Sequence, residues 1–267
     1  MSRIAQCFAD AKASQRKLLI TYQMGGDPGM QESLELMHEM VRAGTDIIEL
    51  GMPFSDPMAD GPVIQAASER VLGKGVRLRH IFELVESFRK TDQKTPLVLM
   101  GYANPIEIMG YGNFADRAAA AGVDGVITVD MPPEEATLLS EEFAKRQLDP
   151  IFLLSPTTPD SRTKEVCKRG SGFIYYVSLK GVTGSAKLDT GDVAEKVSHI
   201  KQLSDMPVAV GFGISDPDSA ARVAEVADAV VVGSAIVKRI AEHGQDRPKM
   251  LASVVEMVAG LRAAIDR

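Results

Sequence analysis

The sequence contains few of the residues that cross-link a chain. It has only two cysteines, Cys7 and Cys167, which lie far apart and lack the spacing of a metal site. Two free thiols in a chain of 267 residues are typical of a protein from a reducing compartment. A core of this size needs no disulfide for its stability. The cysteine content therefore gives no indication of a disulfide-bonded domain.

Other absences exclude classes of partner. The formal net charge is −6, and lysine and arginine are scattered rather than gathered in a stripe, so we expect no binding to nucleic acid. The longest apolar run, which begins at Ala229, has about half the residues that a membrane-spanning helix needs. The histidines lack the spacing of ligands, and we expect no bound metal. Residues 1–17 contain no signal-peptide core, which predicts a cytoplasmic protein.

One pattern repeats along the chain: a short run of Val, Ile and Leu, then polar or glycine-rich residues, then an amphipathic helix. Apolar runs with little alternation are typical of parallel strands that are covered on both faces. Eight such runs are present, at 18–24, 46–51, 97–103, 125–130, 151–155, 173–178, 208–213 and 229–234. Helical patterns between them lie at 32–44, 114–123, 133–147, 160–170, 192–203 and 216–228.

Eight strand–helix units predict an α/β protein in which residues 1–267 form a single (β/α)8 barrel domain, the TIM barrel. An open doubly wound sheet is the alternative, but the glycine fingerprint that usually follows its first strand is missing. We expect extra helical segments at 77–90, at 249–265 and at the N-terminus, where Ile4, Phe8 and Ala11 recur at helical spacing.

A carboxylate stands inside the second apolar run. Active sites of such barrels lie at the C-terminal ends of the strands, and Glu49, between Ile48 and Leu50, lies near the end of its run. A carboxylate in a buried strand is costly unless it is paired or has a function. Two interpretations of Glu49 remain open at this point: a catalytic acid or base, and a structural ion pair inside the barrel.

The loop that follows contains a second carboxylate, Asp60. Its sequence, GMPFSDPMADGP (51–62), has three prolines that restrict the backbone, and glycines that permit unusual turns. A loop of this composition holds Asp60 in place. Asp60 could alternatively cap the helix that begins near Pro62, which is a common use of aspartate.

The segment IELGMPFSDPMADGPVIQAA (48–67) resembles the signature of tryptophan synthase alpha chains. The similarity continues along nearly the whole chain, in the loops after the predicted strands: GDPG (26–29), YANPI (102–106), DMPPEE (130–135), GVTG (181–184), GFGIS (211–215) and GSAIVK (233–238). The short glycine motifs alone would be weak, because many phosphate-binding barrels contain them.

The resemblance implies a lyase of tryptophan biosynthesis that cleaves indole-3-glycerol phosphate to indole and glyceraldehyde 3-phosphate by a retro-aldol reaction. An aryl carbon is a poor leaving group, so C3 of the indole must first gain a proton. By resemblance Glu49 transfers protons at C3 and at the glycerol hydroxyl, and we expect its apolar surroundings to raise its pKa. Asp60 is expected to stay ionised and to hold the ring N–H.

The resemblance also implies two groups of binding residues. The substrate-binding residues are Tyr22, Tyr102, Leu153, Tyr175, Thr183 and Phe212. Most of these could equally be barrel core, and Thr183 resembles the residue of a loop that closes over the site. The phosphate cradle is formed by backbone N–H groups and a helix start at Gly184, Gly213, Gly233 and Ser234. Ordinary turn chemistry is the alternative for these glycines.

In the family this subunit docks on a beta subunit that carries pyridoxal phosphate, in an α2β2 complex; the chain itself is expected to hold no cofactor. The residues that match the docking face are Pro53, Ser55, Asp56, Pro57, Asn104, Pro105, Met131 and Pro132. A face that couples two active sites is expected to shift the closing loop when the partner binds.

The sequence departs from the family pattern at two places. Gln23 and Met24 in the first strand leave the shape of the indole wall open, and Leu179 and Lys180 replace a frequent arginine of the closing loop. Three alternative functions remain: a stand-alone indole-releasing lyase, a non-catalytic activator of the beta subunit, and a sugar-phosphate isomerase. The last would need carboxylates on strands one and five, which carry none here.

Overall fold

The computed structural model of the protein describes residues 1–178, 190–211 and 213–267. The strands are β1 (Leu18–Met24), β2 (Ile47–Gly51), β3 (Leu97–Gly101), β4 (Gly125–Thr128), β5 (Asp149–Ile151), β6 (Leu153–Leu154), β7 (Ile174–Val177), β8 (Val208–Gly211) and β9 (Ala229–Val232). The helices are α1 (Arg3–Ala13), α2 (Met30–Arg42), α3 (Pro62–Gly73), α4 (Leu78–Arg89), α5 (Ala103–Met109), α6 (Tyr111–Ala121), α7 (Thr137–Ala144), α8 (Asp160–Arg169), α9 (Thr190–Leu203), α10 (Pro217–Ala224), α11 (Ser234–His243) and α12 (Arg247–Ile265).

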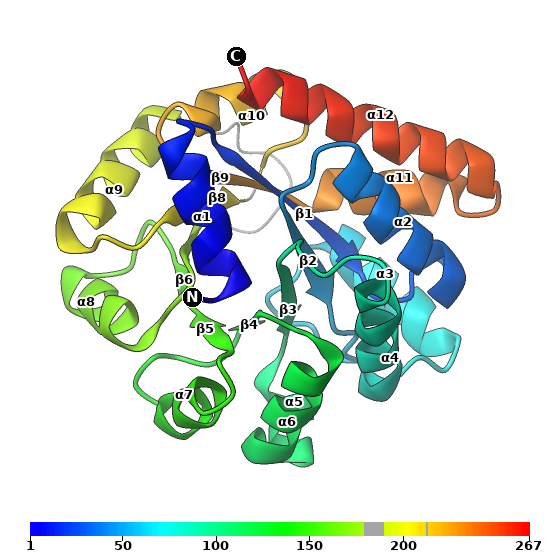
Figure 1. Ribbon diagram of the computed structural model, residues 1–267, viewed down its shortest axis with the longest axis horizontal. Coiled ribbons are helices and arrows are strands. Elements are labelled where there is room, and N and C mark those ends of the chain that lie inside the picture. Colours follow the sequence, from blue (N-terminus) through cyan, green and yellow to red (C-terminus); the bar gives the residue numbers. More distant parts are fainter. Residues whose placement is uncertain (179–189, 212) are drawn as a thin grey trace.

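The strands form one parallel sheet that curls into a barrel. Among the described residues its order is β5-β4-β3-β2-β1-β9-β8-β7-β6. The two ends of this order, β5 and β6, are consecutive in the chain and are separated only by Phe152. Because β5 pairs with β4 and β6 pairs with β7, this one segment links both ends of the ring. The predicted (β/α)8 barrel is confirmed, with its fifth strand divided in two, and Figure 1 shows the helices around the strands.

The helices agree with the predicted pattern except after β3. The extra segments expected at the N-terminus, at 77–90 and at 249–265 are α1, α4 and α12. Residues 102–106 were expected in a loop, which is wrong, because α5 begins at Ala103. Pro105 lies in the first turn of α5, where a helix tolerates proline since no backbone N–H is needed there. None of the described helices is long and apolar enough to cross a membrane.

Alternate residues of each strand face the interior of the barrel and the surrounding helices. On β1, Leu18 and Ile20 belong to an inner cluster, which also contains Ile47, Val98, Ile127 and Ala209. Leu19 packs instead with Leu36 and Met40 of α2, in a cluster on the helix side of the strands. The inner cluster also contains Ile4 and Phe8 of α1, so this helix covers one end of the barrel. Figure 1 shows α1 lying across the strands. The apolar stripe of the N-terminal segment thus fills the floor of the barrel and leaves the opposite end for chemistry.

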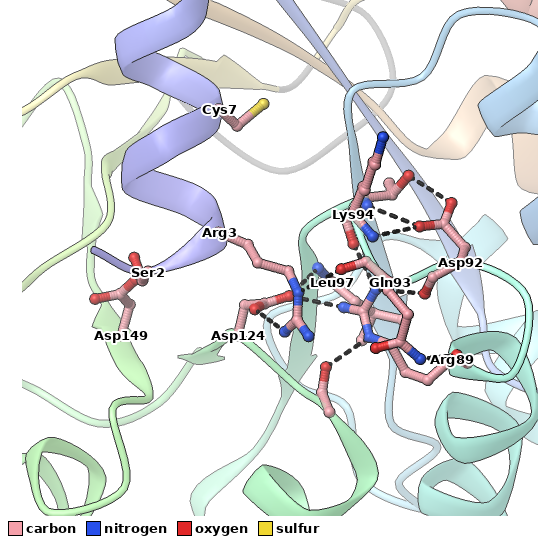
Figure 2. A network of polar contacts seen from close by, with 12 residues as sticks. Ser2, Arg3, Cys7, Arg89, Asp92, Gln93, Lys94, Leu97, Asp124 and Asp149 are labelled. Atoms are coloured by element: carbon pink, nitrogen blue, oxygen red, sulfur yellow. Dashed lines mark hydrogen bonds and ion pairs between the residues drawn. The ribbon is translucent and has the colours of Figure 1, made fainter.

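A polar network fixes α1 and β3 at this floor (Figure 2). Asp124, which is 5% exposed, accepts hydrogen bonds from the guanidinium of Arg89 at 2.7 Å, from that of Arg3 at 2.8 Å, and from the backbone N–H of Leu97 at 2.8 Å. Ser2 donates to Asp149 at 2.8 Å on the other side of α1. The buried carboxylate of Asp124 is therefore neutralised by two cations, and the floor is held independently of the opposite end.

Candidate active site

Glu49 projects into the barrel from the middle of β2. It is the register partner of Tyr22 on β1, so both side chains lie at one level, above the Ile20–Ile47 pair of the inner cluster. Glu49 is 1% exposed, and its Oε2 has no hydrogen-bond partner among the described residues. Burial, with a smaller contribution from the charge of Asp60, raises the pKa of Glu49 to about 8. The carboxyl group therefore holds its proton near neutral pH.

The pKa of Glu49 bears on the ion-pair interpretation. A structural ion pair would lower the pKa of a carboxyl group, because a neighbouring cation favours its charged form. Only burial and another carboxylate act on Glu49, and both raise its pKa. A buried, unpartnered carboxyl oxygen costs free energy that a packed core would avoid. Within the part of the chain that the structure describes, the geometry therefore favours the functional interpretation.

Asp60 lies on the loop between β2 and α3, close to Glu49. The Tyr102 hydroxyl donates a hydrogen bond to its carboxylate and accepts one from the backbone N–H of Ala59 at 3.0 Å. Burial raises the pKa of Asp60 to about 6, although the bond from Tyr102 lowers it. The alternative of a helix cap is wrong: the N-cap of α3 is Gly61, which makes no side-chain cap bond.

Three tyrosines surround the two carboxyl groups. Burial raises the pKa of Tyr22 well above its ordinary value, and the charges of Asp60 and Glu49 raise it further. Burial and the charge of Glu49 act in the same way on Tyr175 of β7. These electrostatic couplings show that Tyr22, Glu49, Asp60, Tyr102 and Tyr175 lie near one another, and Asp60 and Tyr102 follow the C-terminal ends of β2 and β3.

Two glycines make room for this cluster. A Cβ atom at Gly51 would lie 2.3 Å from the hydroxyl oxygen of Tyr22, and one at Gly211 would lie 2.3 Å from that of Tyr175. Such distances are far shorter than a van der Waals contact, so any side chain there would displace the tyrosine. The backbone of β2 and β8 therefore serves as a wall against which the tyrosine rings are set.

Apolar side chains cover the inner cluster at the end of the barrel where the two carboxyl groups lie. Leu153 was expected there and lies partly buried against the inner cluster. Met100, Val129 and Val177 occupy equivalent places and were missed by the sequence analysis. Counting every second residue inward from Val98 and Ile127 would have found Met100 and Val129, because side chains alternate along a strand. Together these residues offer an apolar surface beside two carboxyl groups.

Gln23, where the sequence departs from the family pattern, does not contribute to this apolar surface. Gln23 faces α2, where its amide donates to the backbone oxygen and to the hydroxyl of Ser33, both at 2.9 Å. Met24 belongs to a further apolar cluster, together with Tyr22, Ile64 and Val71. The sequence left the shape of the indole wall open at Gln23 and Met24, and the structure turns the Gln23 side chain towards α2, away from the barrel interior.

The residues expected to bind phosphate lie after β8 and β9. Gly213 is exposed and has φ 77°, and Gly233 is the N-cap of α11, which begins at Ser234. The first N–H groups of a helix have no intrahelical partner and suit an anion. Thr183, Gly184 and Phe212 lie outside the described residues, as do Leu179 and Lys180. Among the described residues no group of three or more His, Cys, Asp or Glu side chains could hold a metal ion.

The residues expected at the docking face follow β2, β3 and β4. Ser55, Asp56 and Asn104 are exposed. Four more are partly exposed: Pro57, Pro105, Met131 and Pro132. Pro53 is buried, so the structure does not bring its side chain to this face. Large exposed apolar side chains on the same loops and helices were missed by the sequence analysis: Met58 at 85%, Ile108 at 81% and Leu138 at 65% exposure.

Comparisons with known proteins agree along the whole chain. The family profile described as "Tryptophan synthase alpha chain" matches residues 8–266. A tryptophan synthase alpha chain of Thioalkalivibrio sulfidiphilus is 58% identical over 266 residues and covers 100% of both chains. One of Thiobacillus denitrificans is 57% identical over 268 residues, covering 100% of this chain and 97% of its own length.

Solved structures give the same result. Tryptophan synthase subunit alpha of Legionella pneumophila superposes with a TM-score of 0.93 at 42% identity, covering 100% of this chain and 99% of its own. A chain of tryptophan synthase of M. tuberculosis, in its aminoacrylate-bound form, superposes with a TM-score of 0.88 at 34% identity, covering 99% of this chain and 100% of its own. The similarity therefore includes the strands, the helices and the loop of Asp60.

Proposed function

The chain belongs to the tryptophan synthase alpha chain family, and on this premise we propose that Glu49 and Asp60 carry out its reaction. The activity is that of a lyase of tryptophan biosynthesis, which cleaves indole-3-glycerol phosphate to indole and glyceraldehyde 3-phosphate. The full-length match does not favour a sugar-phosphate isomerase, a non-catalytic activator or a stand-alone lyase.

The observation that carries the proposed roles is the difference between the two carboxyl groups. Glu49 is buried and unpartnered, with a pKa of about 8, whereas Asp60 has a pKa of about 6. At pH 7 most Glu49 is protonated and most Asp60 is ionised. A proton donor and an anion are what the reaction needs, and a pair of groups with separated pKa values supplies both at one pH.

The steps follow from this arrangement. Glu49 gives its proton to C3 of the indole ring, and Asp60 stabilises the positive charge that then develops at the ring nitrogen. Glu49, now ionised, accepts the proton of the glycerol hydroxyl as the carbon–carbon bond breaks, and the group is protonated again for the next cycle. Every proton that leaves Glu49 is therefore returned by the substrate.

We assign substrate contacts by the same geometry. Tyr22, Tyr175 and Leu153 form the described part of the indole wall, with Met100 and Val129 added to the residues expected from the sequence. Gly213, Gly233 and Ser234 bind the phosphate through backbone N–H groups at the start of α11. Thr183, Gly184 and Phe212 are proposed on the resemblance alone.

The chain is proposed to act with a beta subunit in an α2β2 complex in the cytoplasm. Pyridoxal phosphate belongs to that partner, and this chain needs no cofactor of its own. The exposed apolar side chains of Met58 and Ile108 lie beside the polar residues expected at the docking face. Such a mixture of apolar and short polar groups is typical of an interface between subunits.

Indole release from indole-3-glycerol phosphate tests the proposed function, with and without a beta subunit. Glu49→Gln and Asp60→Asn are expected to abolish turnover, while Glu86→Gln on the exposed face of α4 is the matched control and is expected to leave it unchanged. Glu49→Gln is expected to retain substrate binding, because the phosphate contacts remain. Turnover of Glu49→Gln at the rate of the unaltered chain would refute its role in proton transfer.

A further inference from the structure

The segment that carries Asp60 has no regular secondary structure. Residues 52–61 lie between β2 and α3 and contain only turns and bends. Helical or strand hydrogen bonds therefore cannot fix the direction of the Asp60 side chain. The segment must be held by contacts with its neighbours if Asp60 is to meet a substrate in one geometry.

Ser68, in the second turn of α3, holds the beginning of the segment. Its hydroxyl accepts a hydrogen bond from the backbone N–H of Phe54 at 2.9 Å and donates one to the backbone oxygen of the same residue at 2.8 Å. Ser68 is 1% exposed, so water does not compete for these bonds. Ser68 thus fixes both the backbone N–H and the backbone oxygen of Phe54 to α3.

Gln65, one turn earlier on α3, holds the end of the segment. Its Nε2 donates to the backbone oxygen of Asp60 at 2.8 Å and lies 3.4 Å from that of Pro57. The backbone N–H of Asp60 also donates to the Pro57 oxygen at 3.0 Å, which closes a tight turn before α3. The backbone oxygens of Pro57 and Asp60, at either end of this turn, are therefore both tied to the Gln65 side chain.

Tyr102 connects the two ends. The ring of Phe54 stacks on that of Tyr102 with 5.3 Å between centroids, and the Tyr102 hydroxyl bonds to the backbone of Ala59 and to the carboxylate of Asp60. The contacts form a closed circuit from Ser68 through Phe54, Tyr102 and Asp60 to Gln65. Both contacts with α3 therefore belong to the same set of contacts as the Asp60 carboxylate.

The helix that supports this circuit is itself anchored. Arg70 of α3 makes two hydrogen bonds to the carboxylate of Asp27, at 2.7 and 3.2 Å, on the loop after β1. Asp27 is 1% exposed, so this contact is held in a fixed geometry. Gln65 and Ser68 therefore extend from a helix that is itself tied to the loop after β1.

We propose that Gln65 and Ser68 are positioning residues of the lyase reaction, which act through residues 54–60 and Tyr102 to direct the carboxylate of Asp60 towards the indole nitrogen. The inference rests on the proposed role of Asp60. It assigns to the first two turns of α3 a part in catalysis, in addition to their packing against the barrel.

The test uses isosteric substitutions in the isolated chain, so that effects on partner binding do not enter. Gln65→Met keeps the length and helix propensity of the side chain but removes its donor. Indole release is expected to show a kcat about 10- to 100-fold lower, because a small misplacement of a reacting group has effects of this size. KM is expected to change less than about threefold, because the phosphate contacts lie after β8 and β9.

The pH dependence of kcat/KM provides a second measurement, which a loss of stability alone would not change. The ionisable groups around Asp60 are Tyr22 from β1, Glu49 from β2 and Tyr102 after β3. The hydrogen bond from Tyr102 lowers the pKa of Asp60, so loosening it raises that pKa. The acid limb of kcat/KM is therefore expected at higher pH in Gln65→Met, with the basic limb in place.

Controls separate the possible results. Gln31→Met, at an exposed position in the first turn of α2, is the matched substitution and is expected to change neither kcat nor the pH profile. Ser68→Ala, with Ser253→Ala of α12 as its control, probes the other end of the circuit and decides the matter if Gln65→Met does not fold. Urea unfolding of each variant measures the accompanying loss of stability.

The outcomes are distinct. A lower kcat with a shifted acid limb in Gln65→Met and Ser68→Ala supports the positioning role. Kinetics equal to those of the controls, even with lowered stability, would overturn it and leave these residues a packing role. Asp60→Asn in the same assay tests the underlying assignment separately: full activity in that variant would refute the role of Asp60 itself.

Discussion

The pH dependence of indole release follows from the two carboxyl groups and is the sharpest consequence of the site. With a pKa of about 6 for Asp60 and about 8 for Glu49, the productive form has Asp60 ionised and Glu49 protonated. This form is present at about 80% at pH 7, and it falls about tenfold for each pH unit below 6 or above 8. We expect a bell-shaped profile of kcat/KM whose two apparent pKa values belong to the interacting pair.

Tyr102→Phe tests the origin of the acid limb. The hydroxyl of Tyr102 donates to the Asp60 carboxylate and lowers its pKa, so its removal raises that pKa and moves the acid limb towards neutral pH. A hydrogen bond to a charged group contributes about 1.5–3 kcal/mol, and one pKa unit corresponds to about 1.4 kcal/mol, so a shift of about 1 unit or more is expected. The basic limb, which reports Glu49, is expected to stay in place.

The assay is the initial rate of indole release at low substrate concentration, measured between pH 5 and 9.5 for both proteins. A rate that does not vary across this range would refute the assignment of the two groups. An acid limb that stays at its original pH in Tyr102→Phe would show that the hydroxyl does not stabilise the charged form of Asp60.

Three further predictions concern the walls, the floor and the phosphate. Gly51→Ala places a Cβ atom 2.3 Å from the Tyr22 hydroxyl, and we expect kcat/KM at least about tenfold lower in the indole-release assay; an unchanged value would show that the tyrosine relaxes freely. Asp124→Ala leaves the buried Arg89 unpaired, and urea unfolding is expected to show a loss of about 3–5 kcal/mol with kcat retained in the folded protein; a loss below about 1 kcal/mol would contradict the buried network. Ser234→Asp places an anion at the start of α11, so KM for indole-3-glycerol phosphate is expected to rise, whereas an equal KM would move the phosphate elsewhere.

The strands were predictable because each apolar run is long enough and free of polar alternation. Ile4, Phe8 and Ala11 likewise predicted α1, since their spacing has the period of a helix. The helix α5 was not predicted, because Pro105, its third residue, is equally common in a loop. The division of the fifth strand at Phe152 depends on how the ring closes, and no local pattern contains that information.

In the site, Glu49 was recognisable from the sequence as a carboxylate in an apolar run. The choice between a catalytic group and an ion pair could be made only once the residues around it were known. The cap interpretation of Asp60 could be excluded only by the geometry of Gly61 and Tyr102. The place of Gln23 was left open, because residue types alone do not show which face of β1 a side chain occupies; its hydrogen bonds to Ser33 place it against α2. Gln65 and Ser68 belong to the recognised segment, yet their contacts with the backbone of residues 54–60 appear only in three dimensions.

The central claim is that Glu49 is protonated at neutral pH in the folded chain, and infrared difference spectroscopy measures this directly. Spectra of the unaltered chain and of Glu49→Gln, compared between pH 5 and 10, isolate the carbonyl band of the Glu49 carboxylic acid. The structure predicts a band that persists at pH 7 and disappears around pH 8. A spectrum at pH 7 that contains only the carboxylate form of Glu49 would contradict the proposed mechanism.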